Sequence, residues 1–94
     1  MLEIAHAEYV GDRHVKLTFN DGRSGIADVN EMLQSQPQKL FSALADERVL
    51  KQFTLAHGTL CWSNGLDVAA EYLYYLTFKH DPNLLSLFKQ WAYV

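Results

Sequence analysis

The chain has 94 residues, 49% of them hydrophobic and 13% aromatic, and a formal net charge of -3. A chain of this length forms one domain with a thin core, in which aromatic rings supply much of the buried area. Its eight basic residues are scattered among eleven acidic ones, so it lacks the basic patch typical of nucleic-acid binding. A single cysteine, a start unlike a signal peptide and the lack of a long apolar run predict a cytoplasmic protein outside the membrane.

The first thirty residues predict three antiparallel strands. Residues 2–10 are typical of an edge strand, and Gly11-Asp12 turns the chain. Residues 14–20 alternate apolar and polar side chains, the pattern of a half-buried strand. Asp21-Gly22 follows at once and predicts a type I′ hairpin turn, with the partner strand over residues 25–29.

Short helices are expected in the middle of the chain. Asp28 and Glu31 have the spacing of a capping box before a first helical turn, which Ser35-Gln36-Pro37 breaks. Leu40, Phe41 and Leu44 then recur at helical spacing. Asp46 is placed to cap a second short turn.

The second half predicts another hairpin and two helices. Phe53–Ala56 and Leu60–Ser63 alternate like strands and Gly58-Thr59 joins them, and Asn64-Gly65 adds a second positive-φ turn. Asp67 is expected to cap a helix whose apolar stripe is Ala69, Tyr72, Leu73 and Leu76. Asp81-Pro82 starts a last helix, since Asp is a good N-cap and Pro suits the first helical position.

These elements predict an α+β fold. We expect an antiparallel sheet of about five strands in two hairpin units (β-β-β-α-β-β-α), helices on one side, and an extra C-terminal helix. Residues 1–79 form the core domain in this interpretation, and residues 80–94 are a helical extension of it.

Several runs occur in an order that resembles a known family. They are Leu17-Thr18-Phe19-Asn20-Asp21-Gly22, Asp28-Val29, Leu40-Phe41 with Leu44, Trp62-Ser63-Asn64-Gly65-Leu66-Asp67 and Leu73-Tyr74. Together they resemble the small bacterial family catalogued as domain of unknown function 2442. The resemblance implies antiparallel strands with helices beside them. It also implies that some relatives carry a DNA-binding helix-turn-helix domain and that others are halves of two-gene modules, and it supplies no catalytic residue.

The signature residues have structural explanations. They are Phe19, Asp21, Gly22, Asp28, Trp62, Asn64, Gly65 and Asp67. We interpret Trp62 as a core residue, because it alternates in phase with Leu60. Asp21 belongs to a turn, and Asp28 and Asp67 belong to helix starts, where local hydrogen bonding explains an aspartate.

Residues capable of chemistry do not form a recognisable motif. His6 and His14 could meet across a hairpin near Asp12, but the spacing typical of metal ligands is missing. Cys61 has no neighbouring base in the sequence and is interpreted as a small core residue. No cofactor is expected.

The last helix carries more apolar surface than a narrow stripe holds, in Leu84, Leu85, Phe88 and Trp91. Such an excess favours protein contacts. The hypothesis is therefore a non-enzymatic interaction module that binds another small protein, with self-association through this helix and help from an open sheet edge. The alternatives are a regulatory protein associated with DNA binding, and a small metal-dependent or hydrolytic enzyme using His6, His14 and a signature aspartate.

Overall fold

The computed structural model describes residues 1–35 and 39–94, and the side chains of all of these except Lys39 and Leu40. In this part of the chain, five strands form two antiparallel sheets: β1 Ile4–Gly11, β2 His14–Phe19, β3 Ser24–Asp28, β4 Thr54–Ala56 and β5 Thr59–Cys61. The helical elements are α1 Val29–Ser35, α2 Lys39–Ser42, η1 Ala43–Ala45, α3 Glu47–Leu50, α4 Ala70–Phe78, η2 Pro82–Leu84 and α5 Leu85–Gln90. The predicted α+β class is confirmed, with the five strands divided between sheets of three and two. The predicted break at Gln36-Pro37 and the role of Leu40 lie outside the described structure.

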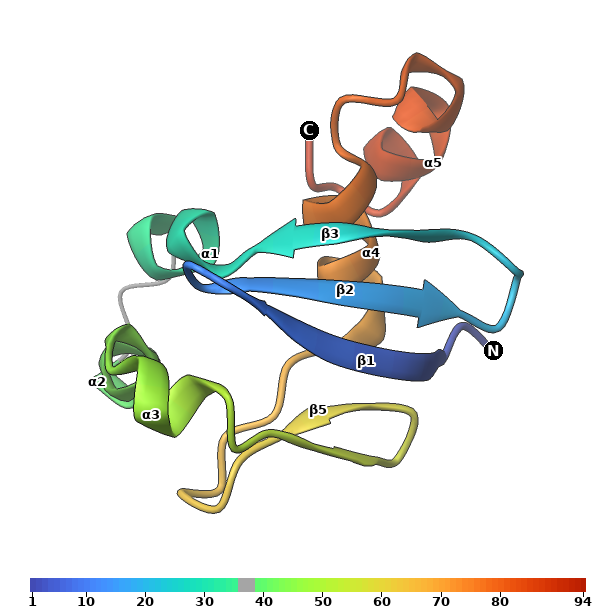
Figure 1. Ribbon diagram of the computed structural model, residues 1–94. Helices are drawn as coiled ribbons and strands as arrows, with labels where there is room; N and C mark the ends of the chain where they lie inside the picture. Colours follow the sequence, from blue (N-terminus) through green and yellow to red (C-terminus); the bar gives the residue numbers. More distant parts are fainter. Residues whose placement is uncertain (36–38) are drawn as a thin grey trace.

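The elements form two layers around one core. α4 crosses one face of the three-stranded sheet, and no element covers the opposite face in the described part of the chain (Figure 1). The β4–β5 hairpin lies beside β1, and the Ile4 N–H donates to the Gly58 carbonyl at 2.8 Å. η2 and α5 lie beyond β3, on the side of the sheet that α4 covers (Figure 1). The sheet order β1-β2-β3 leaves β3 at an edge.

Alternation in β2 produces the core, as the sequence predicts. Val15, Leu17 and Phe19 are buried, whereas Lys16 is exposed. The Phe19 ring contacts the Tyr74 ring edge to face, with centroids 4.9 Å apart. Such pairs add about 0.5–1.5 kcal/mol beyond burial, and this contact joins β2 to α4.

The predicted type I′ turn at Asp21-Gly22 is wrong. β2 and β3 are joined by a longer loop, in which the Gly22 N–H donates to the Phe19 carbonyl and only the glycine has positive φ, at 89°. This is a type I turn completed by a left-handed glycine, the usual three-residue hairpin. The two-residue turns with positive φ at both positions lie at Asp12-Arg13 and His57-Gly58.

The two signature runs form the same turn. In Phe19–Arg23 the Phe19 N–H donates to the Arg23 carbonyl and the Asp21 carboxylate accepts from the Arg23 N–H at 2.9 Å. In Trp62–Leu66 the Trp62 N–H donates to the Leu66 carbonyl and the Asn64 side chain accepts from the Leu66 N–H at 3.0 Å. Gly65 has the same φ as Gly22, 89°. The same sequence pattern therefore reverses the chain twice: an aromatic residue, one further residue, Asp or Asn, and then Gly.

Three of the four predicted helix caps are confirmed. Asp28, Asp46 and Asp81 each accept a hydrogen bond, at 2.9 Å, from the backbone N–H two residues later. The predicted cap at Asp67 is wrong, because α4 begins at Ala70 and its N-cap Ala69 offers no side-chain acceptor. Asp67 instead pairs through its backbone with Cys61.

The apolar face of α4 also differs from the prediction. The buried residues are Ala70, Leu73, Tyr74 and Leu76, whereas Ala69 is exposed and Tyr72 is only partly buried. Both sides of α4 meet apolar neighbours, since the sheet lies on one side and the C-terminal segment on another. A single helical stripe therefore underestimates the buried part of this helix.

Candidate functional site

The C-terminal residues predicted to dock a partner lie mainly in the core. Leu84 and Phe88 are buried, at 8% and 1% exposure, and only Leu85 is well exposed, at 45%. Trp91 is partly buried against Tyr74 and Phe88, with ring centroids 5.9 and 6.0 Å away. The excess apolar surface of this segment is therefore largely used inside the chain, to cover α4.

The signature aromatic Trp62 has the predicted core position. It is 6% exposed, and its indole N–H donates to the Leu50 carbonyl at 2.9 Å. Its ring meets Phe53 edge to face at 6.4 Å. Trp62 therefore fastens the β4–β5 unit to α3, and it is not available as a binding anchor.

Asp21 has a tertiary role that its turn position does not reveal. The Tyr74 hydroxyl donates to its carboxylate at 2.7 Å, across 53 residues of chain. Burial, followed by this hydrogen bond to the carboxylate, raises the pKa of Tyr74 to about 12. The β2–β3 hairpin is thus tethered to α4.

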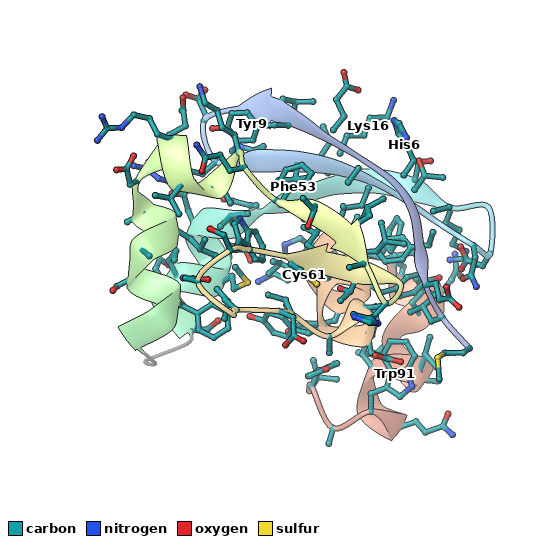
Figure 2. The ribbon with its side chains drawn as sticks, turned by 90° about the horizontal axis from the view of Figure 1, so that it is seen from below. His6, Tyr9, Lys16, Phe53, Cys61 and Trp91 are labelled. Carbon is teal, nitrogen blue, oxygen red and sulfur yellow. The ribbon has the colours of Figure 1, made fainter. Side chains whose placement is uncertain are left out.

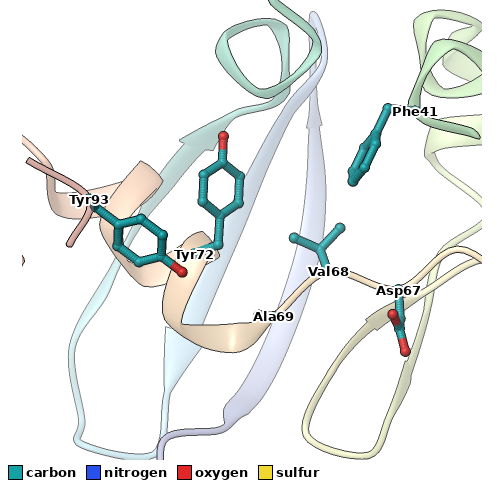
Figure 3. A pocket seen from close by; sticks show the side chains of 6 residues that line it. All are labelled: Phe41, Asp67, Val68, Ala69, Tyr72 and Tyr93. Carbon is teal, nitrogen blue, oxygen red and sulfur yellow. The ribbon is translucent and has the colours of Figure 1, made fainter. Parts of the chain in front are cut away.

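Asp67 lies at the edge of a shallow pocket (Figure 3). The pocket has a volume of about 250 Å³, and its lining residues are Phe41, Asp67, Val68, Ala69, Tyr72 and Tyr93. This is below the ~300–1,000 Å³ of sites for drug-sized ligands. The lining carries a carboxylate and no basic side chain, and the Tyr72 hydroxyl is hydrogen-bonded to the Ser35 hydroxyl at 2.9 Å. The pocket therefore does not offer a phosphate site.

The histidines of the metal hypothesis are not brought together. His6 pairs with Thr18, whereas His14 pairs with Gly11 at the other end of the hairpin. His14 Nδ1 lies 2.8 Å from the Asp12 carbonyl oxygen, and Nε2 lies 3.8 Å from the Asp28 carboxylate. His6 projects from the uncovered face of the sheet (Figure 2). In the described part of the chain, no three His, Cys, Asp or Glu side chains are grouped as metal ligands.

Cys61 is partly buried on the short β4–β5 hairpin (Figure 2). Its thiol lies 3.5 Å from the Ala56 carbonyl oxygen, a partner on the same hairpin. No basic side chain is hydrogen-bonded to it among the described residues. The environment supplies no base to make this thiol a nucleophile.

β3 is an edge strand of the three-stranded sheet, so alternate backbone hydrogen-bonding groups along it point outward. Phe19 and Arg23 bond to each other, as do Arg13 and Val29, and antiparallel pairing alternates between bonded and unbonded residues. The N–H and C=O groups of Ser24, Ile26 and Asp28 therefore point away from β2. The Asp28 C=O belongs to the first turn of α1, which begins at Val29, because the carbonyl of an N-cap residue accepts the first intrahelical bond. For the other outward groups, no hydrogen bond to another strand or loop is found in the described structure.

The side chains along this edge are compatible with an incoming strand. Ile26 is 53% exposed on the uncovered face, and β-branched residues on strands pack well against cross-strand neighbours. On the other face, α4 approaches so closely that a Cβ on Gly25 would lie 2.6 Å from the Thr77 methyl carbon. α4 therefore fixes the position of the edge from beneath, without covering its outward backbone groups.

Charged side chains gather at both ends of β3. At the hairpin end, Arg23 lies 3.9 Å from each of two carboxylates, those of Asp21 and Asp81. At the other end Asp28 is partly exposed, with His14 as its nearest ionisable partner. These pairs leave carboxylates in excess around the strand.

The α1 end of β3 is also tied to α4. Lys79 forms an ion pair with Glu31, and that pair is the main reason that the pKa of Lys79 is raised. The Glu31 side chain therefore binds the end of α4, and not the backbone at the start of α1 as the predicted capping box requires. This pair is neutral overall and leaves the charge balance of the edge unchanged.

Comparison with known proteins places these features in a family. The sequence model described as "Protein of unknown function (DUF2442)" matches residues 4–79. The chain belongs to this family. No curated protein and no solved structure matches the chain. The family match contains the two repeated turns, β3 and α4, whereas η2 and α5 lie outside it.

The β3 edge is the feature that sequence reasoning located least well. An open edge was expected, but periodicity does not say which strand is outermost. The short Gly-containing run Ser24–Asp28 carries a weak signal, because edge strands are often short.

None of the helices in the described residues is both long and apolar enough to cross a bilayer.

Proposed function

We propose that this protein is a non-enzymatic interaction module that binds an extended segment of another protein along β3. The observation that carries the proposal is the row of outward backbone groups on β3, namely the N–H and C=O of Ser24 and Ile26 and the N–H of Asp28. Strand addition satisfies such groups, and side-chain contacts on the two faces add specificity. An uncovered edge also exposes a protein to aggregation, so a bound partner strand gives this edge a function.

The form of the edge favours a single segment as the occupant. α4 and the η2–α5 segment extend past β3 on the inner side of the sheet (Figure 1). A lone strand added in the plane of the sheet would lie over α4 and the η2–α5 segment. A second sheet with its own helices would clash with them. The proposal therefore replaces self-association through the C-terminal helix, since Leu84 and Phe88 are buried there.

The resemblance implies that some relatives in the family are halves of two-gene modules, which suggests that the partner is encoded beside this chain. A small protein expressed beside this chain would reach it at matched concentration, and an extended terminal segment would be enough to occupy β3. Strand addition involves mainly backbone groups, so it tolerates variation in the partner's sequence.

A proline substitution tests the proposal directly. Ile26→Pro removes an outward N–H and leaves the bonds of β3 to β2 intact, since proline is accepted on edge strands at such positions. Ile26→Thr is the matched control, because it shortens the apolar side chain and keeps the N–H. Linear peptides selected from a random display library would be titrated against the parent chain and both variants.

We expect the selected peptides to slow amide hydrogen exchange at Ser24, Ile26 and Asp28. They should bind the Ile26→Thr variant and lose most of their affinity for the Ile26→Pro variant. Both variants should unfold cooperatively, which separates loss of binding from loss of folding. Peptides that bind both variants equally and leave these amides unprotected would refute the proposal.

A further inference from the structure

We infer that the segment bound by β3 is basic, with a positive side chain toward each end of the strand. This inference rests on the proposed function, and it adds the chemistry of the partner. Its basis is the unequal distribution of charge along the edge. The four carboxylates at its two ends belong to Asp21, Asp28, Glu31 and Asp81, and the cations paired with them in the described structure are Arg23 and Lys79. Lys16, opposite Ile26 on β2, has a carboxylate of its own across the sheet, that of Glu8 on β1.

The excess negative charge is divided between the two ends. Asp21 and Asp81 share one guanidinium, that of Arg23, at 3.9 Å each. Glu31 has Lys79 to itself. Asp28 Oδ2 lies 3.8 Å from His14 Nε2, and among the described residues no lysine or arginine forms an ion pair with it. One carboxylate is therefore uncompensated at the hairpin end and one at the α1 end.

The distance between these charges sets the spacing of the partner's basic residues. Ser24 and Asp28 mark the two ends of β3, and a strand rises about 3.3 Å per residue. Two basic residues about four positions apart would therefore lie at the two ends at once. Asp28 shares the uncovered face of β3 with Ile26, whereas Asp21 accepts from Tyr74 on the α4 side. An odd separation close to this one would therefore direct the two basic side chains to these opposite faces. Opposite charges directly across a ladder favour pairing, and like charges oppose it.

The expected size of the effect is modest and measurable. Each cross-strand charge pair contributes ~0.2–1 kcal/mol, so two pairs together change affinity by about 2- to 30-fold. These groups are partly exposed, so salt weakens the effect. The partner should also favour apolar, β-branched residues between its basic positions, because Ile26 is exposed at the middle of β3.

The probes are three alternating valine–threonine peptides. They differ only at two positions, separated by an odd number of residues close to four, that carry Lys, Gln or Glu. N-methylation of one edge of each peptide prevents the peptides from stacking on one another. Affinity is measured at low and high salt, together with amide exchange at Ile26.

Charge-removing variants show whether the effect is local. Asp28→Asn and Asp81→Asn each remove one edge carboxylate, and asparagine keeps the capping acceptor. Asp67→Asn is the matched control, because it removes the same charge from an exposed carboxylate at the pocket. All three variants change the net charge equally, so general attraction to an acidic protein would affect them equally.

We expect the Lys peptide to bind on the order of ten-fold tighter than the Gln peptide and the Glu peptide to bind weakest. The advantage of Lys should shrink in high salt and in the Asp28→Asn and Asp81→Asn variants, and persist in Asp67→Asn. Equal affinities, with Ile26 still protected from exchange, would overturn the basic segment and leave strand addition intact. If no peptide protects Ile26, the proposed function itself fails.

Discussion

The tether between Tyr74 and Asp21 provides the most direct test of how the two layers are joined. Tyr74→Phe removes only the hydroxyl, which donates to the Asp21 carboxylate at 2.7 Å. Tyr74 is 3% exposed, and its ring keeps its edge-to-face contacts with Phe19 and Phe78, at centroid distances of 4.9 and 4.8 Å. The substitution therefore isolates one hydrogen bond from the packing around it.

The expected cost follows from the charge and exposure of the acceptor. A hydrogen bond to a charged group contributes about 1.5–3 kcal/mol. Asp21 is partly exposed and keeps its bond from the Arg23 N–H, so the carboxylate left behind is still solvated. We therefore expect Tyr74→Phe to lower the free energy of unfolding by about 1.5 kcal/mol, near the lower limit.

The same tether predicts a loss of stability at high pH. The pKa of Tyr74 is about 12 in the folded protein and near 10 in an unfolded chain. A raised folded pKa gives stabilisation that is complete below pH 10 and is lost as the pH rises toward 12. The shift corresponds to roughly 2–3 kcal/mol at most, and Tyr74→Phe should lack this part of the decline.

A double-mutant cycle with Asp21→Asn measures the coupling. Urea unfolding of the parent chain, both single variants and the double variant would be followed by circular dichroism at pH 7 and across pH 9–12. We expect a coupling of about 1 kcal/mol or more, as for residues in direct contact. The reasoning is refuted if the two substitutions are additive, or if Tyr74→Phe loses stability above pH 10 as steeply as the parent chain.

Three further predictions concern turns, close packing and the C-terminal segment. Gly22→Ala and Gly65→Ala should each lower the free energy of unfolding by about 1–2 kcal/mol in urea, because both positions have φ of 89° and open space around the added methyl group. Clearly unequal costs would contradict the shared turn. Gly25→Ala should lower stability by about 1–3 kcal/mol, measured by calorimetry, since its Cβ would lie 2.6 Å from an α4 side chain. An unchanged melting temperature would mean that α4 can move away. Phe88→Ala should cost about 3–5 kcal/mol and Leu85→Ala less than about 0.5 kcal/mol in urea unfolding; small, equal effects would restore the C-terminal helix as a docking surface.

Sequence reasoning succeeded where the cause of a structure is local. Alternation in β2 places Val15, Leu17 and Phe19 in the core without reference to any other element. Aspartates at positions 28, 46 and 81 cap the backbone two residues later, a contact inside a single turn. The predicted cap at Asp67 is wrong because the start of α4, three residues farther on at Ala70, is not set by local preference.

Sequence reasoning did not anticipate burial that depends on partners distant in the sequence. Leu84, Phe88 and Trp91 suggested an exposed apolar surface, because a helix considered alone has no neighbours. In the folded chain Phe88 lies 5.1 Å from the Tyr75 ring and 6.4 Å from the Tyr74 ring, and both tyrosines belong to α4. The spacing of apolar residues shows that surface is to be buried, and it does not identify what buries it.

The sequence by itself therefore determined the class of the fold, the two hairpin units and the family, because turns, alternation and capping operate over a few residues. Only the tertiary structure decided that β3 is an open edge, that Tyr74 tethers Asp21, and that the C-terminal segment covers α4. These features depend on which strand is outermost and which faces meet. Such choices are made by the packing of the whole chain, where long-range contacts outweigh local preference.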